Sequence, residues 1–455
     1  MKKFILFIRE HKLLFELTVL FTCCSLATTA QKSFLDKMKD RMSKTKDIIS
    51  STTQLVSTAD VLIKATKMTA GEFNKKVTVV KGDTGRAANV TIPANVTKPK
   101  IENGKFTNLN WEAISYFDTQ LFPSAIISMA TYNGTLTPLL EAISRPLGFS
   151  IMSSQYNIPL KWEIESNDKT YFDKISGSFV YEQPNKIVDL MPVIPWNYEA
   201  LAKHTTTKPL SVYFRLYDED GNKVEKLLQL SLRSINDCIS YYKDLNLQFM
   251  FDAYVQEEDP EIDNILRAAI NTKMVNEFIG YQNEANEKDD RFTMVDLQVA
   301  AIWRVLHDRG FVYSSITTTT GDQGDIHSQV VRTFDNALKT NQANCVDGTV
   351  VFASILRKIG INPFMILVPG HCFLGYSIDK DKTKYHFLET TMLSDDTYLA
   401  KAKTATEKQK AYISEFLDAQ DYAAKEYEKY VSDKSVNAID VSEYRKLIKP
   451  IPIYN

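Results

Sequence analysis

The sequence predicts an α+β protein in which a helical N-terminal segment precedes an antiparallel β-sandwich-like domain and a domain of helices and strands. Three observations lead to this class. The chain has 455 residues, more than one ordinary hydrophobic core accommodates, so two or three domains are expected. Between residues 106 and 245, apolar and polar residues alternate in short runs separated by turn residues, which is typical of antiparallel strands. After residue 246, apolar residues recur at helical spacing.

The composition is that of a globular protein and gives no case for nucleic-acid binding. Hydrophobic residues make up 44% of the chain and charged residues 24%, so a sizeable core can form. The 54 basic and 56 acidic residues leave a formal net charge of −2. Because phosphate binding needs a concentrated basic surface, we expect no nucleic-acid partner.

Residues 1–30 have the pattern of a secretory signal peptide. They combine a basic start with an apolar run at Leu17–Ala27 and small residues just before Gln31, where cleavage is expected. The run is shorter than the roughly 20 residues of a membrane-spanning helix. We therefore expect export to the periplasm or the medium, with no stable membrane span after cleavage. Two alternatives stay open: an uncleaved anchor, and lipidation at Cys23 or Cys24.

The next segments are expected in the order helix, linker, β-domain. Residues 31–105 start with a helical pattern and end in a stretch rich in Gly, Asn and Pro that predicts a linker. Residues 106–245 contain alternating runs such as SAIISMATYNGT and LSVYFRLYDEDGNKVEKLLQLSLRS. Asp220-Gly221 lies between two such runs, which predicts a hairpin.

A calcium loop is an alternative interpretation of this hairpin. Asp218, Asp220 and Asn222 have the spacing of its first three ligands. The twelfth position, however, is Gln229, where the loop requires a bidentate Glu. A plain hairpin turn is therefore favoured, and no metal is expected there.

Residues 246–455 form the last predicted domain, which ends in a charged helix and a tail. Asp259 precedes Pro260 as a helix cap, and a second helix should end at Gly310. The stretch NCVDGTVVFASILRKIG, from Asn344 to Gly360, predicts a buried helix. Three strands should follow, at NPFMILV, CFLGYSI and KYHFLETT, before the charged helix around EFLDAQDYAAKEYEKYV.

The cysteine content points to a free thiol. Cleavage of the signal peptide would leave Cys238, Cys345 and Cys372, an odd number, so the protein is not a disulfide scaffold. Cys345 opens the predicted buried helix, where free backbone N–H groups and the helix dipole stabilise a thiolate.

A base and an acid follow Cys345 in the order that cysteine catalysis requires. His371 begins a predicted strand after a Pro-Gly turn, and Glu389 lies on the next one, where its carboxylate could bind the second ring nitrogen of His371. Strand alternation directs Cys372 to the opposite face, as a packed residue. His386, three residues before Glu389, should also face away from it.

These motifs resemble the transglutaminase-like superfamily within the papain-like cysteine enzymes, in particular secreted bacterial members. The resemblance rests on NCVDGTVVFASILRKIGI, PGHCFLGY and FLETTML, and it spans roughly residues 329 to 393. It implies a papain-like catalytic domain with Cys345 as nucleophile, His371 as base and Glu389 as orienting acid. Gln329 is carried over from the same resemblance as an oxyanion donor. Most members have Asp at the acid position, one methylene shorter than Glu389.

Each of these residues also has a plainer interpretation. Cys345 alone would most simply be a small buried residue, and His371 alone a structural histidine. A metal site made of Cys345, His371 and Cys372 would require two adjacent strand residues to converge, so neither a metal nor another cofactor is expected. Asp347 is expected to stabilise the helix start.

Two functions follow from the sequence. The first is an exported cysteine-dependent hydrolase or acyltransferase that acts on peptide or amide bonds of a peptide or protein substrate through a thioester intermediate. The second is a catalytically inactive binding or scaffold protein of the cell envelope that retains the same domain. The first requires Cys345 and His371 to lie roughly 3 to 4.5 Å apart in the resting protein.

Overall fold

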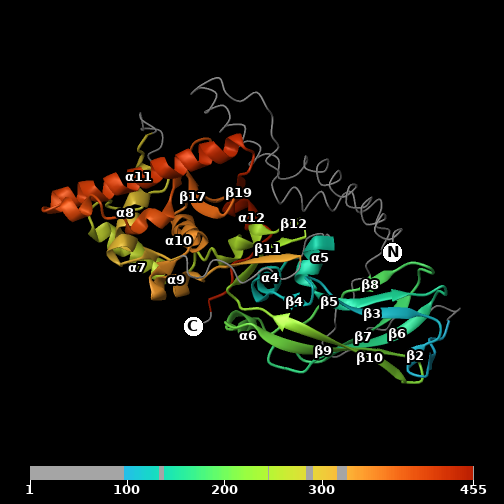
Figure 1. Ribbon diagram of the computed structural model, residues 1–455. Coiled ribbons are helices and arrows are strands. Elements are labelled where there is room, and N and C mark those ends of the chain that lie inside the picture. Colours follow the sequence, from blue (N-terminus) through green and yellow to red (C-terminus); the bar gives the residue numbers. More distant parts are fainter. Residues whose placement is uncertain (1–96, 133–137, 244, 283–290, 315–324, 454–455) are drawn as a thin grey trace. The chain divides into compact units, whose positions relative to one another are not determined.

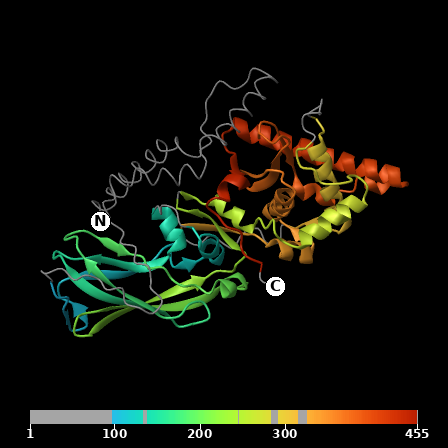
Figure 2. The same cartoon turned by 180° about the vertical axis from the view of Figure 1, so that it is seen from behind.

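The computed structural model describes residues 97–132, 138–243, 245–282, 291–314 and 325–453. The chain divides into two compact units, whose described parts are drawn in Figures 1 and 2. The β unit contains residues 97–245 and 325–327, and the α+β unit contains residues 246–314 and 328–453. The predicted signal peptide and nearly all of the predicted helical segment and linker lie outside the described residues.

The larger sheet of the β unit has five strands in the order β4-β10-β9-β6-β7. Their bounds are Gln120–Leu121 for β4, Lys223–Leu232 for β10, Lys208–Tyr217 for β9, Ile158–Ser166 for β6 and Ile175–Tyr181 for β7. All neighbours are antiparallel except β4, which runs parallel to β10. The structure therefore confirms the expectation of antiparallel strands in this region.

The predicted hairpin joins β9 to β10. Tyr217 pairs with Lys223, and Gly221 has a φ of 83°, a backbone conformation that glycine adopts without strain. Asp218 closes the turn, because its Oδ1 accepts a hydrogen bond from the backbone N–H of Asn222 at 2.8 Å. The carboxylate considered as a calcium ligand thus binds the turn itself.

A second antiparallel sheet in this unit has the order β3-β5-β8, with bounds Asn110–Ser115, Leu147–Met152 and Val188–Leu190. Phe149 of β5 contacts both Trp162 of β6 and Phe214 of β9, at ring-centroid distances of 6.1 and 5.5 Å. The two sheets therefore share an aromatic core. A short hairpin precedes them, made of β1 (Ile101–Glu102) and β2 (Lys105–Phe106).

Three short helices interrupt the strands: α4 (Pro123–Ser128), α5 (Pro138–Ser144) and α6 (Tyr198–Ala202). Helix α4 corrects a prediction from the sequence, in which SAIISMATYNGT was interpreted as an alternating β run. Pro123 is at the helix start, where its missing N–H costs nothing, and all six residues of α4 are buried. Burial on every side hides the helical period that would have distinguished α4 from a strand.

A further three-stranded sheet has the order β12-β11-β14. Its strands are β11 (Asp237–Tyr242), β12 (Leu245–Asn246) and β14 (Ile326–Val330). Residues 325–327, at the start of β14, belong to the β unit, although the sequence analysis assigns them to its last domain.

The α+β unit is built on an antiparallel four-stranded sheet, β18-β17-β16-β19. Its bounds are Pro363–Val368 for β16, His371–Ser377 for β17, Tyr385–Leu388 for β18 and Asn437–Asp440 for β19. The first three strands confirm the sequence prediction. The fourth, β19, is only four residues long and follows the charged helix, so its sequence gave no alternation to recognise.

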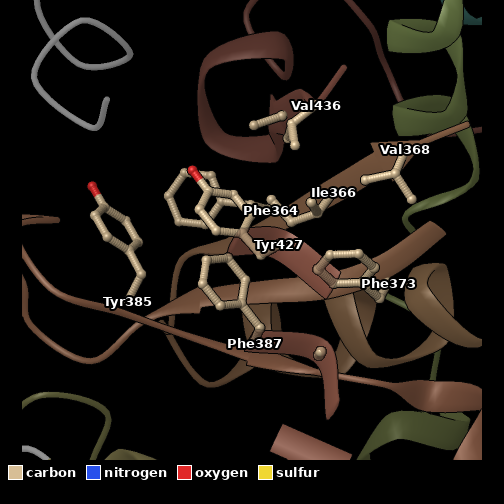
Figure 3. Close-up of a cluster of buried hydrophobic side chains, with 10 residues drawn as sticks. Phe364, Ile366, Val368, Phe373, Tyr385, Phe387, Tyr427 and Val436 are labelled. Atoms are coloured by element: carbon tan, nitrogen blue, oxygen red, sulfur yellow. The ribbon is translucent and has the colours of Figure 1, made fainter. Parts of the chain in front are cut away.

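One face of this sheet is covered by α11 (Ala405–Ser432), the long red helix of Figure 1. Apolar side chains of β16, β17 and β18 pack there against Ala423 and Tyr427 of α11. Figure 3 shows Tyr427 within this cluster, and Phe387 stacks on it with ring centroids 4.3 Å apart. The buried cluster consists of Phe364, Ile366, Val368, Phe373, Tyr385, Phe387, Ala423, Tyr427, Val436 and Ala438.

Helix α10 (Cys345–Lys358) packs against the face of the sheet opposite α11, and its residues 346–356 are all buried. Cys372 of β17 points toward it, with Sγ 3.6 Å from the Thr349 hydroxyl. Trp303 of α8 (Met294–Asp308) contacts Phe352 of α10 and Phe416 of α11. Cys345 therefore begins a helix that is fixed along its whole length.

The remaining described elements of the α+β unit are η1 (Gln248–Tyr254), α7 (Glu261–Asn271), β13 (Val312–Tyr313), α9 (Phe334–Thr340), β15 (Gln342–Ala343), η3 (Thr390–Ser394), η4 (Leu399–Lys401) and α12 (Val441–Tyr444). Helix α7 begins one residue later than expected, with Pro260 as its N-cap residue. Asp259 Oδ1 still accepts the N–H of Glu261 at 2.9 Å. Helix α8 is followed by Gly310 at a φ of 71°, as predicted.

Candidate active site

Cys345 is the first residue of α10, and a capping box fixes its position. The side chain of Asn344 accepts the N–H of Asp347 at 2.9 Å, and the Asp347 carboxylate accepts the N–H of Asn344 at 3.0 Å. The Cys345 thiol is free and partly exposed. Helix geometry leaves the first N–H groups without partners inside the helix, so the cysteine lies where an anion is stabilised.

Asp347 also ties the helix start to the segment after β14. Its carboxylate, fully buried, accepts hydrogen bonds from the Arg332 backbone N–H at 2.7 Å and from the Arg332 guanidinium at 2.5 Å. Burial raises the pKa of Asp347, although these hydrogen bonds oppose the increase. Both oxygens are used by these partners and by Asn344, which gives Asp347 the role in the helix start that the sequence analysis expected.

His371 is the first residue of β17, directly after the turn that joins it to β16. Val368 and His371 are paired across this turn, in which Gly370 has a φ of 74°. The imidazole is partly exposed, and its Nε2 lies 2.6 Å from Glu389 Oε2. Nδ1 is therefore the ring nitrogen left for the thiol.

Glu389 lies just after β18 and caps η3, which corrects its expected position within a strand. Its side chain is 1% exposed. Oε1 accepts hydrogen bonds from the backbone N–H of Thr391 at 3.0 Å and from its hydroxyl at 2.6 Å, while Oε2 binds His371. Both carboxylate oxygens thus have partners, and the carboxylate is oriented toward the imidazole.

The electrostatics of His371 depend on both neighbours. Burial lowers the pKa of His371, but hydrogen bonds with Cys345 and Glu389, together with their negative charges, outweigh burial and raise it to about 10. His371 is thus bound to Glu389, and Cys345 is near enough to influence the pKa of the imidazole. At neutral pH the imidazole is protonated and can stabilise a thiolate.

A close approach between η3 and α10 was not foreseen from the sequence. A Cβ atom on Gly348 would lie 2.7 Å from the hydroxyl oxygen of Thr390 and 3.1 Å from its Cβ. Thr390 follows Glu389 directly, so the missing side chain at residue 348 lets the acid approach the helix that begins with Cys345. The only sequence signal was a glycine inside an otherwise apolar helix.

Gln329 lies on β14, close to the residue before Cys345. Its side-chain amide donates to the carbonyl oxygen of Val330 at 3.2 Å, and the side-chain amide of Asn344 donates to the same oxygen at 2.9 Å. The structure therefore brings Gln329 to the helix start. In this conformation the side-chain N–H of Gln329 is used by the Val330 carbonyl.

The other cysteines and His386 lie apart from this arrangement. Cys238 of the β unit and Cys372 are buried, and burial raises the pKa of both thiols. His386 Nδ1 instead lies 2.7 Å from the Asp296 carboxylate, which also accepts the Tyr376 hydroxyl at 2.6 Å. His386 therefore belongs to a separate buried polar network.

Two further searches concern metals and membranes. Within the part of the chain that the structure describes, no group of His, Cys, Asp and Glu has the arrangement of a metal site. Among those same residues, no helix is both long and apolar enough to cross a bilayer.

A comparison of the sequence with protein-family models finds no match, and a comparison with curated proteins finds none either.

Proposed function

We propose that this protein is a cysteine-dependent hydrolase or acyltransferase acting on peptide or amide bonds, with Cys345 as nucleophile. The observation that carries the proposal is the position of His371, whose Nε2 lies 2.6 Å from Glu389 Oε2 and whose pKa is raised by both Cys345 and Glu389. A free thiol at a helix start, a protonated imidazole and a buried, oriented carboxylate are the three parts of an activated cysteine.

The proposed reaction has two steps. Cys345 Sγ attacks the carbonyl carbon, and His371 gives its proton to the leaving amine as the C–N bond breaks and a thioester forms. Water or a second amine then attacks the thioester while His371 accepts its proton. The acyl product leaves, and the thiolate and the imidazolium are restored.

The negative oxygen of each tetrahedral intermediate needs donors. The backbone N–H of Cys345 is suited to this role, because no acceptor binds it within the described ranges and it lies at the positive end of α10. Gln329 is the proposed second donor. For this role its amide would have to release its hydrogen bond to the Val330 carbonyl and donate to the substrate oxygen instead.

We also propose that the α+β unit is a papain-like domain of the transglutaminase-like type. A buried helix that begins with the cysteine, followed by antiparallel strands that supply the histidine and the acid, supports this proposal. The proposal of export rests on the sequence pattern of residues 1–30 alone.

The test uses a fluorescent iodoacetamide probe on the full chain, with peptide mapping of the labelled site. We expect Cys345 to be labelled selectively at pH 6. His371→Gln should slow this labelling by about tenfold or more, because each unit by which the thiol pKa rises lowers the thiolate fraction about tenfold. His386→Gln is the matched control, because His386 is also a partly buried histidine bound to a carboxylate. Equal labelling in all three proteins would favour the inactive scaffold.

A further inference from the structure

Strand β13 lies beside the start of α10. It runs parallel to β15, whose last residue is followed by Asn344 and then Cys345. The backbone N–H of Val312 donates to the Asn341 carbonyl at 3.0 Å, and that of Ser314 donates to the Ala343 carbonyl at 2.8 Å. These bonds fix β13 against the segment that leads into the cysteine.

The other edge of β13 is open within the described part of the chain. Successive residues of a strand direct their main-chain groups to opposite sides, so the N–H and C=O of Tyr313 point away from β15. Neither group has a partner among the described residues. Both side chains of the strand are exposed, Val312 by 40% and Tyr313 by 42%.

Tyr313 is close to the reactive groups. β13 contacts η3, the helix that Glu389 caps. Partial burial, together with the negative charges of Cys345 and Glu389, raises the pKa of the Tyr313 phenol. An exposed aromatic ring and a main-chain edge with no partner among the described residues thus lie beside the segment that leads into Cys345.

We propose that the substrate is a peptide whose main chain binds in an extended conformation along β13, with one of its side chains against the Tyr313 ring. The proposal rests on the proposed function and specifies its substrate class. Addition of a strand to an open edge uses the N–H and C=O of the peptide, and the tyrosine adds apolar contact. A small amide has only the bond that reacts, and no further peptide N–H or C=O group that could pair with the edge of β13.

The experiment compares two alkylating reagents on the full chain, with the rate at Cys345 followed by mass spectrometry. One is a mixed-sequence library of acetyl tetrapeptide chloromethyl ketones, and the other is iodoacetamide, which has no peptide chain. We expect Tyr313→Ala to slow the peptide reagents about fivefold, the range of one aromatic contact, and to leave the iodoacetamide rate unchanged. Tyr422→Ala, which removes an exposed tyrosine from α11, is the matched control.

A second measurement tests the main chain itself. The same library with N-methylated internal amides should react more slowly with the wild-type protein, because it lacks the peptide N–H donors. The proposal is overturned if N-methylation has no effect, or if Tyr313→Ala slows both reagents equally. Failure of the proposed function gives a different result: His371→Gln would then leave both rates unchanged.

Discussion

At the scale of single residues, the candidate site consists of three side chains fixed by local bonds of different kinds. Cys345 lies within a capping box, His371 follows a tight turn, and Glu389 is held by the N–H and hydroxyl of Thr391. Each bond forms within a few residues of the side chain it fixes. These local bonds orient each side chain, whereas the packing of α10, β17 and η3 brings the three side chains together.

The first prediction concerns the three thiols of the described residues. Alkylation of the native protein should modify Cys345 at least about tenfold faster than Cys238 or Cys372, because burial protects both and raises the pKa of their thiols. Peptide mapping after a short exposure to iodoacetamide measures the three rates. Faster modification of Cys372 would contradict the assignment of the reactive thiol.

The residues of the site could be proposed from the sequence because their types occur in catalytic order with a helix and strands between them. Alternation along the strand also separated Cys372 from His371. The bond from Thr391 and the nearness of Tyr313 could not be proposed, because both depend on where η3 and β13 lie in three dimensions. A single sequence contains no signal for such contacts.

At the scale of elements, the distance between α10 and η3 depends on Gly348. The second prediction is that Gly348→Ala slows alkylation of Cys345 by about tenfold, since the new methyl group would displace Thr390 and the adjoining Glu389. The helix itself should be retained, because Ala is favoured over Gly in a helix by about 1 kcal/mol.

A rescue and a control separate this effect from general destabilisation. Thr390→Ala in the same chain removes the hydroxyl that the new methyl group meets and should restore most of the rate. Gly375→Ala in β17, where a Cβ would lie 3.2 Å from Ile366, should lower stability without the same loss of reactivity. A double variant as slow as Gly348→Ala alone would show that Thr390 is not the obstacle.

Elements with a clear period were predicted well from the sequence, and fully buried or very short ones were not. The strands β16, β17 and β18 and the helix α10 agree with their predicted positions. The short helix α4 was mistaken for a strand, because all its residues are buried and no polar face marks its period. Strand β19 is defined by its pairing with β16, which lies some 70 residues earlier in the chain.

At the scale of the α+β unit, a buried carboxylate joins two segments that lie far apart in the chain. Asp252 of η1 is fully buried, and Arg445, which follows α12, lies 3.4 Å from its Oδ2. Burial raises the pKa of Asp252 to about 7, although Arg445 opposes this increase. The folded protein therefore binds this proton more tightly than the unfolded chain, and the resulting stability is lost as the pH rises from about 4 to above 7.

The third prediction follows from this loss of stability with rising pH. Asp252→Asn should stabilise the protein at pH 8, on the order of 2 kcal/mol, and have little effect near pH 4, because Asn resembles the protonated acid. Arg445 keeps a charged partner in Glu257, 2.8 Å away. Urea unfolding at both pH values measures the difference, with the exposed Asp335→Asn as control. A loss of stability at pH 8 would mean that the Asp252–Arg445 attraction exceeds the cost of burial.

The central claim is that Glu389 holds His371 in the state that activates Cys345. The most direct test is the pH dependence of Cys345 alkylation in the wild-type site and in Glu389→Gln, with Cys23, Cys24, Cys238 and Cys372 replaced by Ser or Ala. Glu415→Gln is the control, because Glu415 is also a buried carboxylate that accepts two backbone N–H groups.

We predict that Glu389→Gln shifts the alkylation curve to higher pH and slows the reaction at pH 6 by about tenfold or more, since the imidazolium loses its carboxylate. The control should follow the wild-type curve. Overlapping curves from wild type and Glu389→Gln, both folded, would contradict the claim and leave at most a pair of Cys345 and His371.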